Sequence, residues 1–140
     1  MRDKRFIPEH RGGPLKKEQH YQLINWTCGC AEHVLPLLGE DIDGRLIHAL
    51  NVGRSWAQGN ASVGDARKTS VAMHALARES QDMMVIELGR AVGHAVATAH
   101  MADHSLVAAL YALKAVKSAG KSVAAERNGK MNSCLLRLRS

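Results

Sequence analysis

The chain has 140 residues, of which 46% are hydrophobic and 23% are charged. A chain of this length can bury one core but not two, and this composition excludes an intrinsically disordered protein. The formal net charge is +6, but Lys130, Arg137 and Arg139 supply +3 of it near the C-terminal end. The rest of the chain is close to balanced, so its charge alone does not indicate a nucleic-acid-binding protein.

Residues 1–15 lack the features of a helix. Pro8, Pro14 and the Gly12–Gly13 pair are all unfavourable in a helix interior. The segment is basic but has no row of aromatic side chains on which bases could stack. We therefore expect an N-terminal arm that is either disordered or strapped onto the rest of the protein, and no nucleic-acid partner.

No segment has the pattern of a secretory signal peptide or of a membrane-spanning helix. Residues 1–5 are charged, but no apolar stretch follows them. The longest weakly polar run, residues 91–102, is too short to cross a bilayer. We expect a cytoplasmic protein with no membrane partner, in which the three cysteines are reduced.

Apolar residues recur at steps of three and four from Lys16 onward, which predicts helices. Pro36 should end or kink the first helix, and Asp41 or Asp43 should cap a second helix at about residues 45–57. The pattern Ser62-x-x-Asp65 resembles a capping box at the start of a third helix, which residues 79–82 should end.

The fourth helix has the clearest apolar stripe, and a fifth should follow it. Met84, Leu88, Ala91, Ala95 and Ala99 form that stripe. Asp103 is a candidate N-cap for the fifth helix, and Gly120 is a plausible stop. No alternation typical of strands is visible. The predicted fold is all-α: a compact bundle of about five helices over residues 16–128, with an arm at 1–15 and an irregular tail at 129–140.

Gly89, Gly93 and Ala97 form a second stripe on the fourth helix, at four-residue spacing. Small residues in this arrangement let another backbone approach closely, and such packing would offset the cost of about 1 kcal/mol for each glycine in a helix. One hypothesis is therefore a self-associating module, with a homodimer formed through this stripe.

The candidate functional cluster consists of His94, His100, Asp103 and His104. Imidazoles four residues apart on one helix can share a metal ion, so His100 and His104 are weak metal candidates. If Asp103 caps a helix, however, a turn separates the two histidines. The alternative to a metal site or a small enzyme is a set of partly buried histidines that bond to the backbone or to a carboxylate.

A second candidate for metal binding is the Cys28-x-Cys30-x-x-His33 pattern. On a helix the two cysteines point about 200° apart, so both could bind one ion only if the helix unwound at Gly29. No fourth ligand occurs at a suitable spacing. Buried thiols are the alternative interpretation.

Other common catalytic and cofactor-binding motifs are absent from the sequence. There is no Gly-x-Ser-x-Gly elbow, no cysteine in a recognisable protease setting and no glycine-rich phosphate loop. We expect no catalytic residues and no cofactor, and a non-enzymatic protein is the preferred interpretation.

Several segments together resemble a known family. They are Arg11-Gly12-Gly13-x-Leu15, the stretch from Trp26 to Leu38 that contains Cys30-Ala31-Glu32-His33, Trp56-Ala57-x-Gly59, Val63-Gly64-x-Ala66-Arg67, and the stretch from Gly93 to His104 that continues into Tyr111–Lys114. The chain resembles, over about residues 2–128, a family of small bacterial immunity proteins, the immunity-5-like domain of toxin systems.

This resemblance implies a protein that binds and neutralises a toxin in conflict between bacteria. It supplies no catalytic residue set. The partner would be a protein toxin of unknown identity, recognised by surface complementarity around a few anchor residues. The segments that carry the resemblance add secondary candidate residues: Glu32, His33, Trp26, Trp56 and Arg11.

The tail departs from the family pattern, in which a Trp and later a Leu-Pro pair follow the position of Asn128. With one choice of synonymous codons, a single base inserted after the Asn128 codon changes residues 129–135 to Trp-Glu-Asn-Glu-Gln-Leu-Pro. We therefore hypothesise that residues 129–140 arise from a one-base frameshift. Sequencing the gene across this junction tests the hypothesis.

Overall fold

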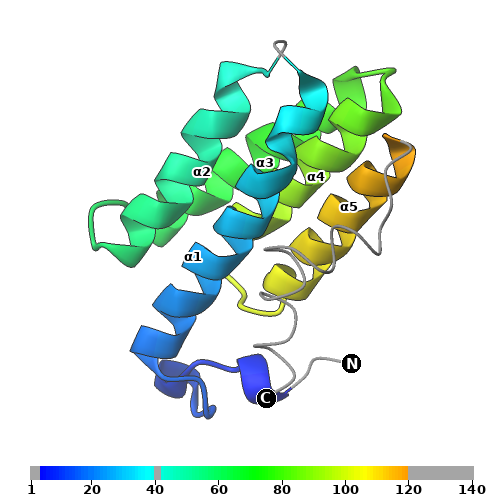
Figure 1. Cartoon of the computed structure of the whole chain (residues 1–140). Coiled ribbons are helices and arrows are strands. Elements are labelled where there is room, and N and C mark those ends of the chain that lie inside the picture. Colours follow the sequence, from blue (N-terminus) through cyan, green and yellow to red (C-terminus); the bar gives the residue numbers. More distant parts are fainter. Residues whose placement is uncertain (1–3, 40–41, 120–140) are drawn as a thin grey trace.

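The computed structural model describes residues 4–39 and 42–119, and every regular element in these ranges is a helix (Figure 1). The predicted all-α bundle with a short N-terminal arm is confirmed. The α-helices are α1 (Lys17–Val34), α2 (Gly44–Ala57), α3 (Val63–Glu79), α4 (Met83–Ala97) and α5 (His104–Ser118), and the 3-10 helices are η1 (Lys4–Phe6), η2 (Glu9–Arg11) and η3 (Leu35–Leu38). Gly120 and the tail at 129–140 lie outside the described residues.

Side-chain caps explain where three of the helices begin. The Asp43 carboxylate accepts from the backbone N–H of Arg45 at 2.9 Å, and Asp82 accepts in the same way from Met84 at 2.9 Å. Ser62 and Asp65 form the predicted capping box, with reciprocal hydrogen bonds of 3.0 and 3.1 Å. Each bond satisfies a backbone N–H that has no partner within the helix.

Asp103 lies at the N-cap position of α5 as predicted, but its side chain makes no capping hydrogen bond. Its backbone is already in the helical region, with φ −67° and ψ −15°, rather than in the extended conformation usual for an N-cap. The prediction that Asp103 is the N-cap residue of α5 is therefore confirmed for its position, but the capping hydrogen bond from its side chain does not form. Pro36 acts as predicted, because α1 ends at Val34 and the chain continues into η3.

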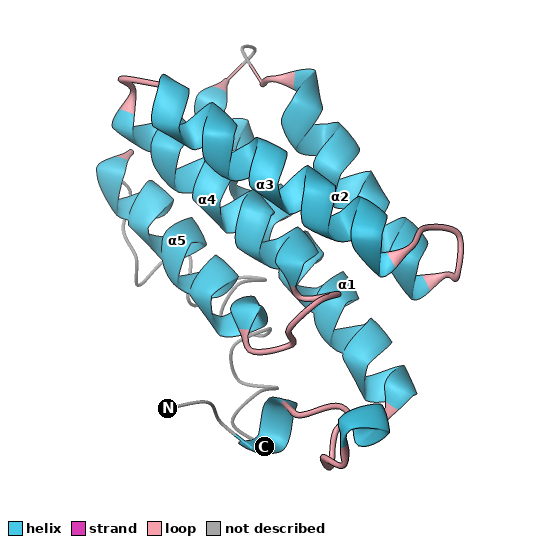
Figure 2. Ribbon diagram, turned by 180° about the vertical axis from the view of Figure 1, so that it is seen from behind, coloured by secondary structure: helices cyan, strands magenta, loops and turns pink. Residues whose placement is uncertain are grey.

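The helices form two layers, with α1 and α2 in one layer and α3, α4 and α5 in the other (Figures 1 and 2). Helix α4 is central, since it packs against all four of the other α-helices. The contact between the layers is apolar, and its fully buried side chains include Ile24, Leu46, Leu50, Leu88, Val92 and Val96. Alanines on α4 and α5 let these two helices lie close together.

The described part of the arm, residues 4–15, is strapped onto one end of the bundle. The backbone N–H of Glu9 donates to the Leu15 carbonyl at 2.8 Å, and that of Leu15 donates to the Ile7 carbonyl at 3.0 Å. These bonds close a tight loop. Gly13 fits there because a Cβ atom at this position would lie 2.1 Å from the Ile7 oxygen. Phe6 holds the loop in place by packing in a small apolar cluster with Leu23 and Ala102.

Candidate functional site

The site starts from two histidines on successive helices. His94 lies near the end of α4, and His104 is the first residue of α5. Their Nδ1 atoms are 2.9 Å apart, so one imidazole donates a hydrogen bond to the other. Of the predicted cluster, the structure therefore brings these two residues together. His100 and Asp103 lie in the turn between α4 and α5, which is the turn that the sequence predicts between His100 and His104.

Two further rings complete the cluster, and sequence analysis did not identify either as part of a site. His74 on α3 meets His94 edge to face, with ring centroids 4.7 Å apart. Tyr111 on α5 lies parallel to His94, with centroids 5.6 Å apart and planes 6° from parallel. The four half-buried rings form a row across three helices, which we call the ring row: His74, His94, His104 and Tyr111. Tyr111 belongs to one of the segments that resemble the family, and nothing in the local sequence distinguishes His74.

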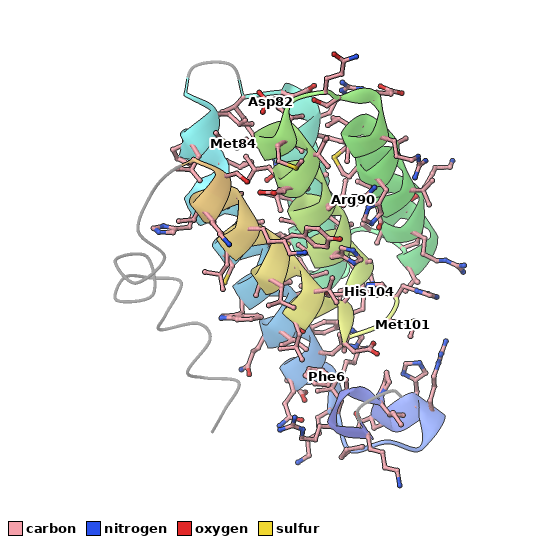
Figure 3. The ribbon with its side chains drawn as sticks, turned by 90° about the vertical axis from the view of Figure 1, so that its right-hand side faces the viewer. Phe6, Asp82, Met84, Arg90, Met101 and His104 are labelled. Atoms are coloured by element: carbon pink, nitrogen blue, oxygen red, sulfur yellow. The ribbon has the colours of Figure 1, made fainter. Side chains whose placement is uncertain are left out.

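A basic side chain lies at each end of the ring row. Arg90, which is labelled with His104 in Figure 3, places its Nη1 atom 3.5 Å from Nδ1 of His74. At the other end, the Lys114 Nζ atom lies over the Tyr111 ring, 4.7 Å from its centroid. This second contact has the geometry of a cation–π interaction. The arrangement is therefore cationic at both ends and aromatic between them.

The imidazoles of His74 and His94 are held in the neutral form near pH 7. The pKa of His94 is lowered to about 4, mainly by burial and in smaller part by the nearby His74, His104 and Arg90. Burial also lowers the pKa of His74, with contributions from Arg90, His104 and Arg78. No acidic side chain is among the causes of either shift. These two imidazoles can therefore donate and accept hydrogen bonds, but they resist protonation in the isolated protein.

The geometry does not favour a metal ion at the histidines. Two imidazole ligands of one tetrahedral zinc ion lie about 3.3 Å apart, because each Zn–N bond is about 2.0 Å. The Nδ1 atoms of His94 and His104 are closer than this and bond to each other. Over residues 4–39 and 42–119, no group of three or more His, Cys, Asp or Glu side chains is placed to hold a metal ion.

The second metal candidate is excluded by the direction of its side chains. Cys28 is buried in the core cluster that contains Leu46, whereas Cys30 is buried in a different cluster, with Leu88. His33 is exposed. Burial raises the pKa of the Cys28 thiol to about 12, so the thiolate needed for metal binding does not form near neutral pH. The three residues do not form a site.

The secondary candidates are dispersed over the other helices and the arm. Glu32 forms an ion pair of 2.7 Å with Arg54, and Arg11 is exposed at the end of η2. Trp56 packs against Tyr21 and against His20, whose Nε2 atom donates to the Thr98 carbonyl at 2.6 Å. Trp26 is half-buried between α1, α5 and the arm. These contacts are structural, and they do not converge on one place.

The predicted homodimer stripe is a contact within the chain. Gly89, Gly93 and Ala97 are buried, and α3 packs against α4 along this side. A Cβ atom at Gly93 would lie 2.9 Å from Nε2 of His74, and one at Gly89 would lie 3.2 Å from the Ala77 Cβ. The close approach predicted from the small residues therefore occurs, but with α3 of the same chain. The hypothesis of a homodimer through this stripe is wrong.

The fold and the site define a class of protein: a small α-helical bundle in which the half-buried rings of the ring row form part of the surface and are not arranged around a metal ion. Within the described residues, no helix is long and apolar enough to cross a membrane. A family model described as "Imm-5 like putative immunity protein" matches residues 13–135. The chain belongs to this family, as the resemblance of its motifs predicts. The match begins and ends later in the chain than the residues 2–128 that suggested the resemblance. Neither the curated proteins nor the solved structures contain a significant match.

Proposed function

We propose that this chain neutralises a bacterial toxin in the cytoplasm by binding it directly, without a chemical reaction. The observation that carries the proposal is the family match, which covers residues 13–135 and therefore most of the chain. The structure is compatible with a binding role, since the ring row offers hydrogen bonds and aromatic surface in a fixed arrangement. Fixed side chains lose little entropy on binding, which favours affinity.

Two features support binding over catalysis. The thiol of Cys28 is buried and protonated, and the imidazoles of His74 and His94 are held neutral by burial beside other basic groups. A general base works best with a pKa near the operating pH, and the pKa of about 4 for His94 is far below that. The half-buried imidazoles of His74 and His94 are instead suited to a static interface.

Co-expression tests the proposal. A toxin domain that co-purifies with this chain from its source bacterium is expressed in a sensitive bacterial host, alone or with this chain. We expect the chain to restore growth and to co-purify with a catalytically inactive variant of the toxin. An unrelated toxin domain serves as the matched control. Loss of growth despite a well-expressed chain, or rescue without any complex, would contradict neutralisation by binding.

A further inference from the structure

The α3–α4–α5 layer carries side chains that point away from the rest of the bundle, among them Arg90 of the layer's central helix (Figure 3). On α3 and α4 these side chains recur at steps of three and four residues and so form one stripe on each helix. On α5, Lys114 lies between the stripe of His104 and Tyr111 on one side and Leu110, one turn before it, on the other. We call this surface the three-helix face. Besides the ring row it comprises Arg67, Val71 and Arg78 on α3, Met83, Glu87 and Arg90 on α4, and Leu110 and Lys114 on α5.

The three-helix face is basic, and ion pairs among the described residues do not neutralise its charges. It holds four basic side chains and one carboxylate, Glu87, which accepts hydrogen bonds from Ser118. Among the described residues, Arg67, Arg78, Arg90 and Lys114 form no ion pair. On the other layer, by contrast, Arg45 pairs with Asp43 at 2.8 Å and Arg54 pairs with Glu32 at 2.7 Å. Unpaired charge on one face indicates an anionic partner.

Apolar side chains lie among these charges. Val71 is 65% exposed, and Met83 and Leu110 are each 58% exposed. They are the three most exposed of the large hydrophobic residues in the described chain, and each lies on a different helix of this face. Arg, Tyr and Met beside exposed aliphatic groups are typical of protein interfaces, whereas interfaces with nucleic acid are more strongly positive and more polar.

We infer that the three-helix face is the docking surface for a protein partner whose own surface carries Asp and Glu side chains around an apolar patch. The inference rests on the proposed function and specifies where the toxin binds and with what chemistry. Carboxylates of the partner contact Arg78, Arg90 and Lys114, and its apolar groups cover Val71, Met83 and Leu110. The ring row, which contacts Arg90 at one end and Lys114 at the other, lies within this surface and keeps its position on binding.

The first experiment maps an acidic polypeptide without requiring the toxin. Poly-L-glutamate is added to the isotopically labelled full chain, and backbone amide shifts are followed by NMR at low ionic strength. We expect the largest shifts at residues of the three-helix face. Lys16 and Lys17 are also basic, but they lie at the start of α1 in the other layer and should show smaller shifts. Larger shifts at Lys16 and Lys17 than on this face would overturn the inference, as would tighter binding of duplex DNA than of poly-L-glutamate.

Charge reversal provides the matched variants. The triple variant Arg78→Glu, Arg90→Glu and Lys114→Glu should bind poly-L-glutamate and the toxin at least about tenfold more weakly, because each lost contact is charge-assisted. Lys68→Glu is the control, since Lys68 is exposed on another side of α3. It should change the affinity less than about twofold. Two controls separate lost binding from lost folding. One is a second triple variant with Gln at the three positions, and the other is a comparison of the amide spectra of all the variants.

The outcomes distinguish this inference from the proposed function. If the toxin binds the charge-reversed triple variant as tightly as the parent chain, the docking surface is elsewhere, although neutralisation by binding still holds. If poly-L-glutamate maps to the three-helix face but the chain protects against no toxin, the proposed function fails and the acidic-partner surface stands.

Discussion

At the scale of single residues, the contact between Gly93 and His74 organises the outer layer of the bundle. The imidazole of His74 occupies the space where a Cβ atom of residue 93 would be, 2.9 Å from its Nε2 atom. From this position the His74 ring contacts His94 edge to face, and its Nδ1 atom lies 3.5 Å from Nη1 of Arg90. The glycine therefore positions the first ring of the row.

Replacing Gly93 tests this role. Gly93→Ala should lower the free energy of unfolding by about 1–2 kcal/mol, because the gain in helix propensity is smaller than the cost of displacing a packed ring. Gly29→Ala in α1 is the matched control. A Cβ atom at Gly29 meets nothing within 4 Å, so this change should stabilise the protein by about 0.5–1 kcal/mol. Urea unfolding measures both, and equal effects of the two substitutions would contradict the assigned contact.

The ring row also predicts how stability depends on pH. The pKa of His94 is about 4 in the folded protein and 6.5 is its ordinary value, so the unfolded chain binds more protons between these pH values. The free energy of unfolding should therefore fall as the pH is lowered from about 7 toward 4.5, by about 1–2 kcal/mol from this half-buried ring after solvent screening. The lowered pKa values of His74 and His20 act in the same direction.

Chemical denaturation at a series of pH values measures this effect. His94→Gln keeps a hydrogen-bonding group beside His104 but cannot take up a proton, so its stability should fall less steeply with acid. His48→Gln, an exposed position on α2, should keep the parent's pH dependence. If His94→Gln has the same slope as the parent, the imidazole of His94 is not held neutral by the fold.

At the scale of the helices, local signals predict most of the boundaries. The Ser62–Asp65 capping box and Pro36 act where the sequence predicts, because each depends on residues within one turn of the helix end. The N-cap bond of Asp103 was the exception. The backbone of Asp103 itself is already near helical values, so the side chain has no extended N-cap geometry from which to reach back.

The cap of α3 can be measured directly. Ser62→Ala removes the side-chain oxygen that accepts from the Asp65 N–H at 3.0 Å and should cost about 1 kcal/mol of stability. Ser62→Asn retains a suitable oxygen and should cost much less. Thermal and urea unfolding of the two variants provide the comparison, and an equal loss in both would show that the hydroxyl of Ser62 does not cap the helix.

At the scale of the whole molecule, the arrangement of helices determines which predicted site residues meet. His94 and His104 are ten positions apart, and the turn between their helices brings them together, so the sequence identified both. His74 belongs to a helix whose position beside α4 depends on packing, and no local pattern marks it. The Gly89–Gly93–Ala97 stripe was correctly predicted as a close approach, but periodicity cannot tell a helix of the same chain from one of a second chain.

The same limit applies to function. Composition, charge and spacing predicted a helical protein without an evident catalytic set, whereas the family was recognised from its motifs and is confirmed by the match over residues 13–135. The three-helix face was not predicted, because Arg78, Arg90 and Lys114 come from three separate helices. Their shared surface exists only in the folded bundle.

The most direct test of the central claim is the stoichiometry of neutralisation. The purified toxin domain is held at a fixed concentration well above the dissociation constant, and its remaining activity is measured as this chain is added. Neutralisation by binding predicts a linear loss of activity that is complete when one chain is present for each toxin molecule, with a complex of that composition in solution. Full inactivation by a small fraction of an equivalent would show that the chain acts as an enzyme and would contradict the account, as would undiminished toxin activity in the presence of excess chain.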